Sequence, residues 1–271
     1  FDLSRQSVRE LNAFLHEREP AGTSESLVVE VANPNGMHSL AVGLNARMRP
    51  HIQGIDHAVI LVRDLEKSQR AYQRMGFTLT PRGFHTLGSI NHLVVLGRTY
   101  VELLGLPPET PDARPEIRDA PDGLDALVFR SHDAEATRSE AAARGAPVGP
   151  VQQFSRPVAI GVDSRDAVFR TVRTAPGCAQ AGRLYFCEHL TPQLVWHGPW
   201  QSHPNGALEL VGARVRVADV AREERLYGSL LGDAAIERRA GGFTAHAIRS
   251  NYPARSTSWR SWWTRDRDRR G

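Results

Sequence analysis

The chain has 271 residues, 41% of them hydrophobic, and a formal net charge of +4. This length and composition suffice to bury a core, so we expect a globular protein rather than a disordered one. No apolar run approaches the roughly 18–20 residues that cross a bilayer, and the first residues lack the apolar segment of a signal peptide. We therefore expect a cytoplasmic protein without a membrane partner.

The positive charge does not indicate a nucleic-acid partner, because it is concentrated at one end of the chain. Residues 250–271 hold six Arg and two Asp, which account for the whole net charge. A nucleic-acid-binding protein usually carries a basic stripe on its folded body. We predict that 250–271 is a disordered tail rich in Arg and Trp. The two cysteines, Cys178 and Cys187, are too few for a disulfide framework and are expected to be reduced thiols.

An internal repeat is the strongest signal in the sequence. A shift of 69 residues sets "GIDHAVILVRDLEKSQRAYQRMGFTLTP" over "GLDALVFRSHDAEATRSEAAARGAPVGP" without a gap. The shift superimposes Gly54 on Gly123, Asp56 on Asp125, Asp64 on Asp133 and Gly76 on Gly145. Self-similarity of this kind predicts one structural unit used twice.

Each copy predicts a strand, a helix and then three strands. The first strands are the apolar segments 58–62 and 127–129, and the helices begin after Asp64 and Asp133, whose carboxylates can cap them. Gly76 and Gly145 end the helices, because glycine enters the left-handed region at little cost. The later strands are expected at 77–81, 90–97 and 99–106, and at 148–154, 166–174 and 183–190. We predict an α+β fold with βαβββ modules at 53–109 and 121–197.

The flanking segments give weaker signals. A partial third module is expected at 206–249. Residues 1–52 predict an amphipathic helix and an apolar hairpin over 26–44, with Asn-Pro-Asn-Gly at its turn. Their pattern resembles the opening of the GXGXG β-helix domain of glutamate-synthase-like proteins, without the glycine-rich coils that define it. We interpret them as an appendage without chemistry of its own; the alternative is that both ends derive from a rearranged reading frame.

The doubled unit carries a family resemblance. Together with "HAVILVRDLEKSQRAYQRMGF", "FHTLGSINHLVVLGRTYVELLGL" and "CEHLTPQLVW", it resembles the vicinal oxygen chelate superfamily and, within it, the glyoxalase-like domain proteins, over about 53–245. The resemblance implies that each unit forms a strongly curved four-stranded sheet and that paired units enclose a cup. It also implies a divalent metal held by a ligand on the first strand and a carboxylate on the fourth. His57 and Glu102 stand at those places.

The residues themselves favour the same pair. Strand alternation puts His57 on the face of Val59, and Glu102 on the face of Tyr100. A carboxylate in the apolar stretch around Glu102 is costly unless it is paired, protonated or bound to metal. Imidazole and carboxylate together suit zinc, iron(II), manganese or nickel better than calcium. A buried hydrogen bond between the two side chains, without a metal, is the alternative.

The second copy does not repeat this ligand pair. Ala126 matches His57, and an alignment of Tyr185 on Tyr100 puts Cys187 in the place of Glu102. Zinc takes three or four protein ligands. A metal on His57 and Glu102 would therefore need a further ligand from Cys187, His189 or His85.

Other residues predict an organic ligand in the cup. "FHTLGSIN" (84–91) resembles the His…Gly-Thr-x-Asn loop of the glyoxalase-like proteins, with Ser89 in place of Thr. The predicted substrate-binding residues are His85, Asn91, Tyr100, His189 and Trp196. Two alternatives stay open: Asn91 bonds its own loop, and the segment 189–206 is a connector that packs its tryptophans on the sheet edge.

These observations lead to two functional hypotheses. The first is a metal-dependent lyase, isomerase or dioxygenase acting on a small oxygenated organic substrate, with Glu102 as metal ligand or catalytic base. The second is a metal-free module of the same fold that binds a small molecule. The residues do not determine the substrate, the metal or the oligomeric state.

Overall fold

Both copies of the repeat fold into the same order of elements in the computed structural model. The first copy consists of β3 (Ile52–Leu61), α2 (Leu65–Arg74), β4 (Gly83–Phe84), β5 (Ile90–Val95) and β6 (Tyr100–Gly105). The second consists of β7 (Gly123–Ser131), α4 (Ala134–Ala143), β8 (Val148–Ile160), β9 (Asp163–Thr174) and β10 (Arg183–His189). The short helix α3 (Pro115–Arg118) lies between them in sequence.

The structure describes residues 28–32, 39–40, 51–160, 163–215, 217–239, 241–247 and 255–256. The helix predicted near the start of the chain lies outside these residues, as does almost all of the predicted tail. Among the described residues, no helix combines the length and apolar character that crossing a bilayer requires.

One eight-stranded sheet joins the two copies, in the order β4-β5-β6-β3-β7-β10-β9-β8. β3 pairs in parallel with β6, β7 pairs in parallel with β10, and β3 and β7 meet antiparallel at the centre. Each copy thus contributes four adjacent strands. This arrangement confirms the predicted α+β fold of tandem βαβββ modules.

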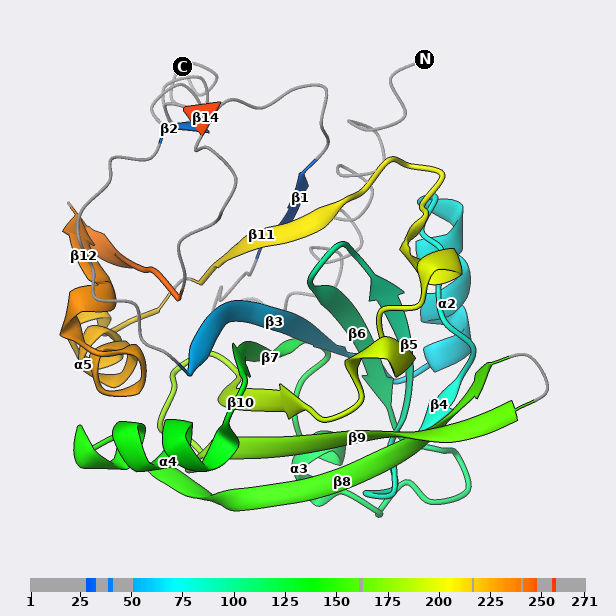
Figure 1. The fold of residues 1–271 in the computed structure, drawn as a ribbon, viewed down its shortest axis with the longest axis horizontal. Coiled ribbons are helices and arrows are strands. Elements are labelled where there is room, and N and C mark those ends of the chain that lie inside the picture. Colours follow the sequence, from blue (N-terminus) through cyan, green and yellow to red (C-terminus); the bar gives the residue numbers. More distant parts are fainter. Residues whose placement is uncertain are drawn as a thin grey trace.

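The sheet curves until its two edges meet. The edge strands β4 and β8 contact each other, and Figure 1 shows the long β8 and β9 reaching across to β4. The loop after β4 bonds to β8 directly: Thr86 N donates to Ser155 O (3.1 Å), and Ser155 N donates to Thr86 Oγ1 (3.3 Å). The inner face of the sheet is therefore enclosed on nearly all sides.

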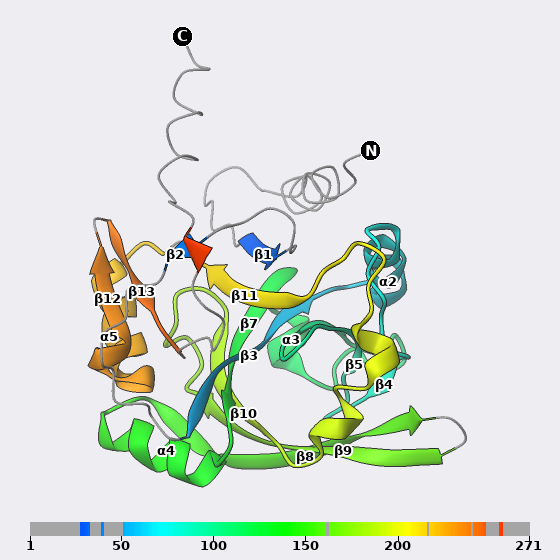
Figure 2. The same cartoon turned by 45° about the horizontal axis from the view of Figure 1, so that its top comes forward.

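The helices cover the outer face and the largest core cluster fills the inside. Figure 2 shows α2 and α4 outside the curve of the sheet. Both begin as expected, because Asp64 accepts from Lys67 N (2.8 Å) and Asp133 from Ala136 N (2.9 Å). The inner cluster combines side chains from both copies, including Val59, Leu93, Leu104, Val128, Phe169 and Cys187. Alternate residues of the strands therefore point into the enclosed space.

The strand predicted at 77–81 is wrong. The third element of the first copy is the two-residue strand β4 (Gly83–Phe84). Thr80 does lie beside β5, where its N donates to Leu93 O (2.9 Å), but Leu93 N donates to the Thr80 side-chain hydroxyl (2.9 Å). Because a hydroxyl takes the place of the backbone carbonyl, no regular ladder forms there.

The hairpin predicted over 26–44 is also wrong. β1 (Val28–Ala32) pairs with β11 (Glu209–Arg214), and β2 (Ser39–Leu40) pairs with β14 (Arg255–Ser256). Apolar runs indicate strands but do not specify their partners.

The segment after the second copy contains β11, α5 (Val220–Leu231), β12 (Ile236–Arg239) and β13 (Gly242–Ala245), and β12 pairs with β13. Short 3₁₀ turns at Pro192–Leu194, Gly198–Gln201 and Asp233–Ala235 complete the described elements. The division of the chain into domains stays a prediction.

The cap of α2 gives a test of the fold. Replacing Asp64 with Ala removes the acceptor for Lys67 N and is expected to lower the free energy of unfolding by about 1 kcal/mol. Urea denaturation followed by circular dichroism measures this change. Glu109→Ala, in an exposed loop away from α2, is the matched control and should alter stability by less than about 0.5 kcal/mol. Equal stability of the two variants would contradict the capping role.

Candidate functional site

A cavity lies inside the curve of the sheet. It contains about 550 Å³ of space between protein atoms, including the part open to solvent. The first copy lines it with polar side chains on β3, β5 and β6 and the loop before β5, namely His57, His85, Asn91, Tyr100 and Glu102. The wall from the second copy includes Arg156, Thr171, Arg173, Arg183, Tyr185 and Cys187. The enclosed space is therefore polar on both sides.

His57 and Glu102 come together in this cavity. β3 and β6 pair with His57 opposite Tyr100 and Val59 opposite Glu102, so alternation turns both polar side chains inward. His57 Nε2 lies 3.8 Å from Glu102 Oε2, and the two residues are 3% and 6% exposed. The Tyr100 ring stacks on the His57 ring at 4.2 Å. The imidazole is thus held in one plane, facing the carboxylate.

Asp56 orients His57 from behind. Its carboxylate is fully buried and accepts from His57 Nδ1 (2.7 Å), His189 Nε2 (2.8 Å) and Arg130 Nε (2.7 Å). Burial favours a higher pKa for Asp56, but the charges and hydrogen bonds of His189 and His57 outweigh it and hold the pKa well below its ordinary value. Asp56 is therefore an ionised acceptor.

Sequence reasoning missed Asp56 as a site residue. The register of β3 against β7 shifts between Ile55 and His57. Such a bulge lets neighbouring side chains meet instead of pointing to opposite faces. The available signal was an acidic residue inside an apolar strand, repeated as Asp125 in the second copy.

The Asp56 contact also determines which nitrogen of His57 faces the cavity. An ionised carboxylate can only accept, so Nδ1 carries a proton, and the tautomer that results has its Nε2 lone pair directed inward. Nε2 lies 3.4 Å from the Tyr185 hydroxyl. Burial raises the pKa of Tyr185 far above its ordinary value, so this phenol stays protonated. His57 is thus arranged to accept a proton at Nε2.

Asn91 and His85 surround the other oxygen of Glu102. Asn91 Nδ2 donates to Glu102 Oε1 (2.6 Å) and lies 3.3 Å from His85 Nε2. Burial raises the pKa of Glu102, but the nearby His85 and His57 and the Asn91 hydrogen bond bring it below its ordinary value. Burial lowers the pKa of His85 to about 4, so this ring is neutral near pH 7. The predicted pair His85 and Asn91 therefore lies at Glu102, in the cavity wall.

His189 and Trp196 lie behind the cavity lining. His189 bonds Asp56, and the Trp196 ring is 4.8 Å from the His189 ring. The Arg130 guanidinium lies 4.4 Å from the centre of the Trp196 ring, a cation–π distance. These two predicted substrate-binding residues therefore support Asp56 rather than face the enclosed space.

The strand register shows that the predicted match of Cys187 with Glu102 is wrong. Val59 pairs with Glu102, and the matching Val128 pairs with Tyr185. Tyr185, not Cys187, therefore occupies the place of Glu102 in the second copy. Matching the two tyrosines in sequence displaced the alignment by two residues, which preserves the face but not the position.

The residues do not fit a metal shared by both copies. The second copy offers the Ala126 methyl and the protonated Tyr185 phenol where the first offers His57 and Glu102. In the first copy His85 lies 3.6 Å from Glu102, but His57, His85 and Glu102 do not form a group whose ligand atoms all lie within 4.8 Å of one another. The first copy alone therefore does not assemble the three or four protein ligands that zinc takes.

A different group of residues could hold a metal ion. The ligand atoms of Asp56, Cys187 and His189 lie within 4.8 Å of one another. However, the Asp56 oxygens already accept from His57, His189 and Arg130. Burial, together with the Asp56 and Glu102 carboxylates, raises the pKa of Cys187 well above its ordinary value, which favours the thiol over the metal-binding thiolate. This group fits a hydrogen-bonded network better than a metal centre.

The fold and the cavity define a class of protein. Two βαβββ copies that share a nearly closed sheet around a polar cavity are what the resemblance to the vicinal oxygen chelate superfamily implied. The family model described as "Glyoxalase-like domain" matches residues 55–231. The chain belongs to this glyoxalase-like domain family, which confirms the resemblance. No curated protein sequence matches the chain.

Solved structures resemble this fold at low identity. A hypothetical protein from Staphylococcus aureus is 15% identical with a TM-score of 0.42, over 50% of this chain and 58% of the other. Methylmalonyl-CoA epimerase from Mycobacterium tuberculosis is 18% identical with a TM-score of 0.40, over 53% and 93%. A methylmalonyl-CoA epimerase in complex with methylmalonyl-CoA and NH4+ is 16% identical with a TM-score of 0.40, over 51% and 96%.

Gly83 provides a test of how Asn91 is positioned. A Cβ at Gly83 would overlap Asn91 Oδ1. Gly83→Ala is expected to displace the amide from Glu102 and to lower the free energy of unfolding by about 1–3 kcal/mol, measured by urea denaturation. Gly149→Ala is the control, because its Cβ would approach only Arg173 O at an ordinary 3.7 Å. An equally small effect of both substitutions would refute the close packing around Asn91.

The low pKa of His85 predicts a pH dependence of stability. The pKa of His85 is about 4 in the folded protein, whereas the ordinary pKa of a histidine is 6.5. Between these values the unfolded chain binds more protons, so stability falls as the pH is lowered from 6.5 towards 4. The loss due to His85 is at most about 3 kcal/mol. In urea denaturation at pH 7 and 4.5, His85→Gln should show a smaller difference than the wild type; an unchanged difference would count against the assignment.

Proposed function

We propose that this protein is a glyoxalase-like isomerase or lyase that catalyses proton transfer on a small oxygenated organic substrate bound in the cavity. The observation that carries the proposal is the geometry of His57. Its Nδ1 is held by the ionised Asp56, and its Nε2 faces Glu102 at 3.8 Å. A base oriented by a buried carboxylate is an arrangement suited to general acid–base catalysis.

Glu102 is the proposed base that removes a proton from a carbon beside a carbonyl group. The carbon–hydrogen bond breaks, its proton moves to Glu102, and the electron pair passes to the carbonyl oxygen to form an enolate. His57 Nε2 is close enough to receive this proton from Glu102 and return it to another atom of the substrate. Return to a different carbon or to oxygen gives isomerisation, whereas loss of a leaving group from the enolate gives elimination.

Neighbouring residues can stabilise the two charged species of this reaction, the imidazolium of His57 and the enolate of the substrate. Asp56 would stabilise the imidazolium that forms when His57 takes up the proton. The Tyr185 hydroxyl, protonated and 3.4 Å from His57 Nε2, is available to donate to the enolate oxygen. Apolar neighbours in the cavity wall, Leu93, Leu104 and Phe169, reduce competition from water.

A divalent metal is not required by this proposal. Zinc, iron(II), manganese or nickel bound to His57 and Glu102 would supply Lewis-acid stabilisation of the substrate oxygen. The ligand positions of the second copy are Ala126 and Tyr185, which do not complete the donor set. For the same reason we favour isomerase or lyase chemistry over a dioxygenase, which needs a metal or another cofactor to use oxygen.

Metal content tests this part of the proposal. After incubation with each of the four metals and removal of the excess, elemental analysis should find less than about a tenth of an equivalent per chain. A stoichiometric metal that His57→Gln abolishes would overturn the metal-free proposal. A metal lost instead in Cys187→Ser would assign it to the group of Asp56, Cys187 and His189.

Hydrogen–deuterium exchange at carbon tests the proton transfer itself. Wild-type protein in D₂O should exchange a carbon-bound proton of at least one member of a panel of 2-oxo acids, 2-hydroxy ketones and 1,3-dicarbonyl compounds, followed by NMR. His57→Gln and Glu102→Gln should each slow this exchange by about 10²–10⁴-fold. His132→Gln, an exposed imidazole outside the cavity, is the control that keeps the wild-type rate.

A metal-free binding module is the second candidate. The replacement of both second-copy ligand positions, by Ala126 and Tyr185, favours it. A panel compound that binds without any exchange, and whose affinity changes only modestly in His57→Ala, would support this candidate and contradict the enzyme.

A further inference from the structure

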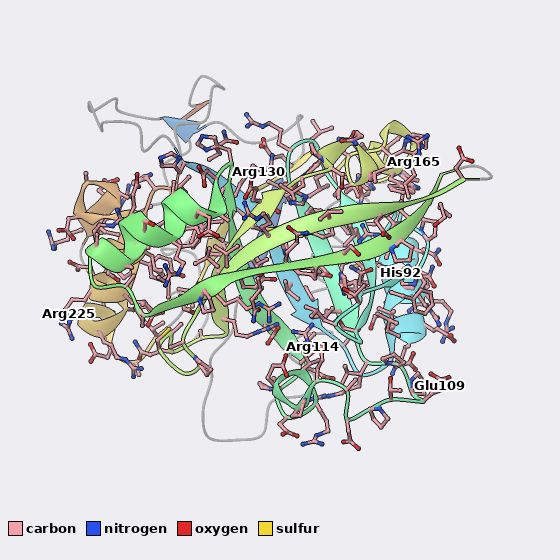
Figure 3. All side chains as sticks on the ribbon, turned by 60° about the horizontal axis from the view of Figure 1, so that its bottom comes forward. His92, Glu109, Arg114, Arg130, Arg165 and Arg225 are labelled. Carbon is pink, nitrogen blue, oxygen red and sulfur yellow. The ribbon has the colours of Figure 1, made fainter. Side chains whose placement is uncertain are left out.

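The lining of the cavity is rich in arginine. Four guanidinium groups line the cavity, from Arg114, Arg156, Arg173 and Arg183. The last three come from consecutive strands of the second copy, β8, β9 and β10. Arg114 immediately precedes α3, as Figure 3 shows. The lining contains one carboxylate, that of Glu102.

Two of these arginines are neutralised by neighbouring acids. Arg114 Nε lies 2.9 Å from Glu116 Oε1, and Arg183 is paired with Asp125. For Arg156 and Arg173, by contrast, the described part of the chain provides no ion-pair partner. Arg156, Arg173 and Glu102 together therefore leave one uncompensated positive charge in the cavity.

Burial makes this uncompensated charge costly. Arg156 is 3% exposed, and its Nη2 has no hydrogen-bond partner among the residues described. The same is true of Arg173 Nε, and burial lowers the pKa of both guanidinium groups. The Arg173 guanidinium lies 5.8 Å from the centre of the Tyr185 ring, which compensates its charge only in part. A buried charge without an ion-pair partner is costly, and an anion bound in the cavity would offset that cost.

We propose that the substrate carries a carboxylate, which Arg156 and Arg173 bind inside the cavity that His57 and Glu102 also line. A planar guanidinium donates two parallel hydrogen bonds to a carboxylate. One carboxylate also matches the single positive charge that the cavity leaves uncompensated, whereas a phosphate dianion would exceed it. The substrate is thus a small carboxylic acid with an oxygen function near the reacting carbon.

Two further side chains give this substrate an orientation. Thr171 Oγ1 and Asn91 Oδ1 are buried in the cavity wall and have no hydrogen-bond partner within the described residues. Thr171 lies on β9, two residues before Arg173, and Asn91 bonds Glu102. When the arginines hold the carboxylate, a hydroxyl group of the acid can donate to Asn91 Oδ1, and a carbonyl oxygen can accept from the Thr171 hydroxyl.

Isothermal titration of the full chain tests this proposal. The probes are pyruvate and lactate, their uncharged amides, and inorganic phosphate. Pyruvate or lactate should bind at least about tenfold more tightly than its amide, the least that a charge-assisted hydrogen bond contributes. Equal binding of acid and amide, or stronger binding of phosphate than of both acids, would overturn the proposal.

Variants assign the binding to the two arginines. Arg156→Gln and Arg173→Gln should each weaken carboxylate binding by about 10–100-fold and leave amide binding unchanged. Arg156→Lys keeps the charge but loses the planar fork, so its affinity should fall between wild type and Arg156→Gln. If Arg156→Gln does not fold, Arg173→Gln provides the same comparison.

Arg165→Gln is the matched control. Arg165 is an exposed arginine at the far end of β9 (Figure 3), so this variant should bind carboxylates like the wild type. Unchanged carboxylate affinity in the Arg156 and Arg173 variants would refute the assignment.

The proposal rests on the proposed function only for the reaction that follows binding. His57→Gln should slow proton exchange by about 10²–10⁴-fold while carboxylate binding stays within about threefold of wild type. Selective carboxylate binding without exchange in the wild type would contradict the enzyme but support the carboxylate site. Exchange that extends equally to uncharged substrates would contradict the carboxylate site alone.

Discussion

The buried carboxylate of Asp56 is the interaction on which the candidate site depends. It lies at the seam between the two copies, on β3, and receives donors from three strands: His57 on β3, Arg130 on β7 and His189 on β10. A fully buried carboxylate is tolerated only when such donors compensate the loss of water. The same contacts that stabilise the charge also give His57 a single tautomer and a single direction.

The two copies share one order of strands and helices but carry different side chains at the cavity. The first copy presents His57, Glu102 and Asn91 to the cavity, and the second presents Arg156 and Arg173. Closure of the sheet between β4 and β8 encloses both sets in one cavity. The cavity therefore combines acid–base groups from the first copy with cations from the second. Two identical sets of side chains would not provide both.

Much of the fold was predictable because it depends on local patterns. The 69-residue repeat, the capping Asp64 and Asp133 and the alternation of buried residues each act over a few positions, and the structure follows them. The wrong predictions concern strand pairing, which depends on a second strand elsewhere in the chain. A hydroxyl of Thr80 interrupts a ladder that the pattern predicted, and β1 pairs with β11 instead of β2.

The sequence by itself determined the tandem βαβββ fold and the inward direction of His57 and Glu102, because strand periodicity and helix capping are local. Only the tertiary structure decided the rest of the site. The bulge in β3 brings Asp56 to His57, the parallel register places Tyr185 at the position of Glu102, and closure of the sheet brings the arginines into the same cavity. These features depend on pairing between residues far apart in the chain. Alternation along one strand determines which face each side chain takes, but it does not specify which residue of which other strand lies alongside.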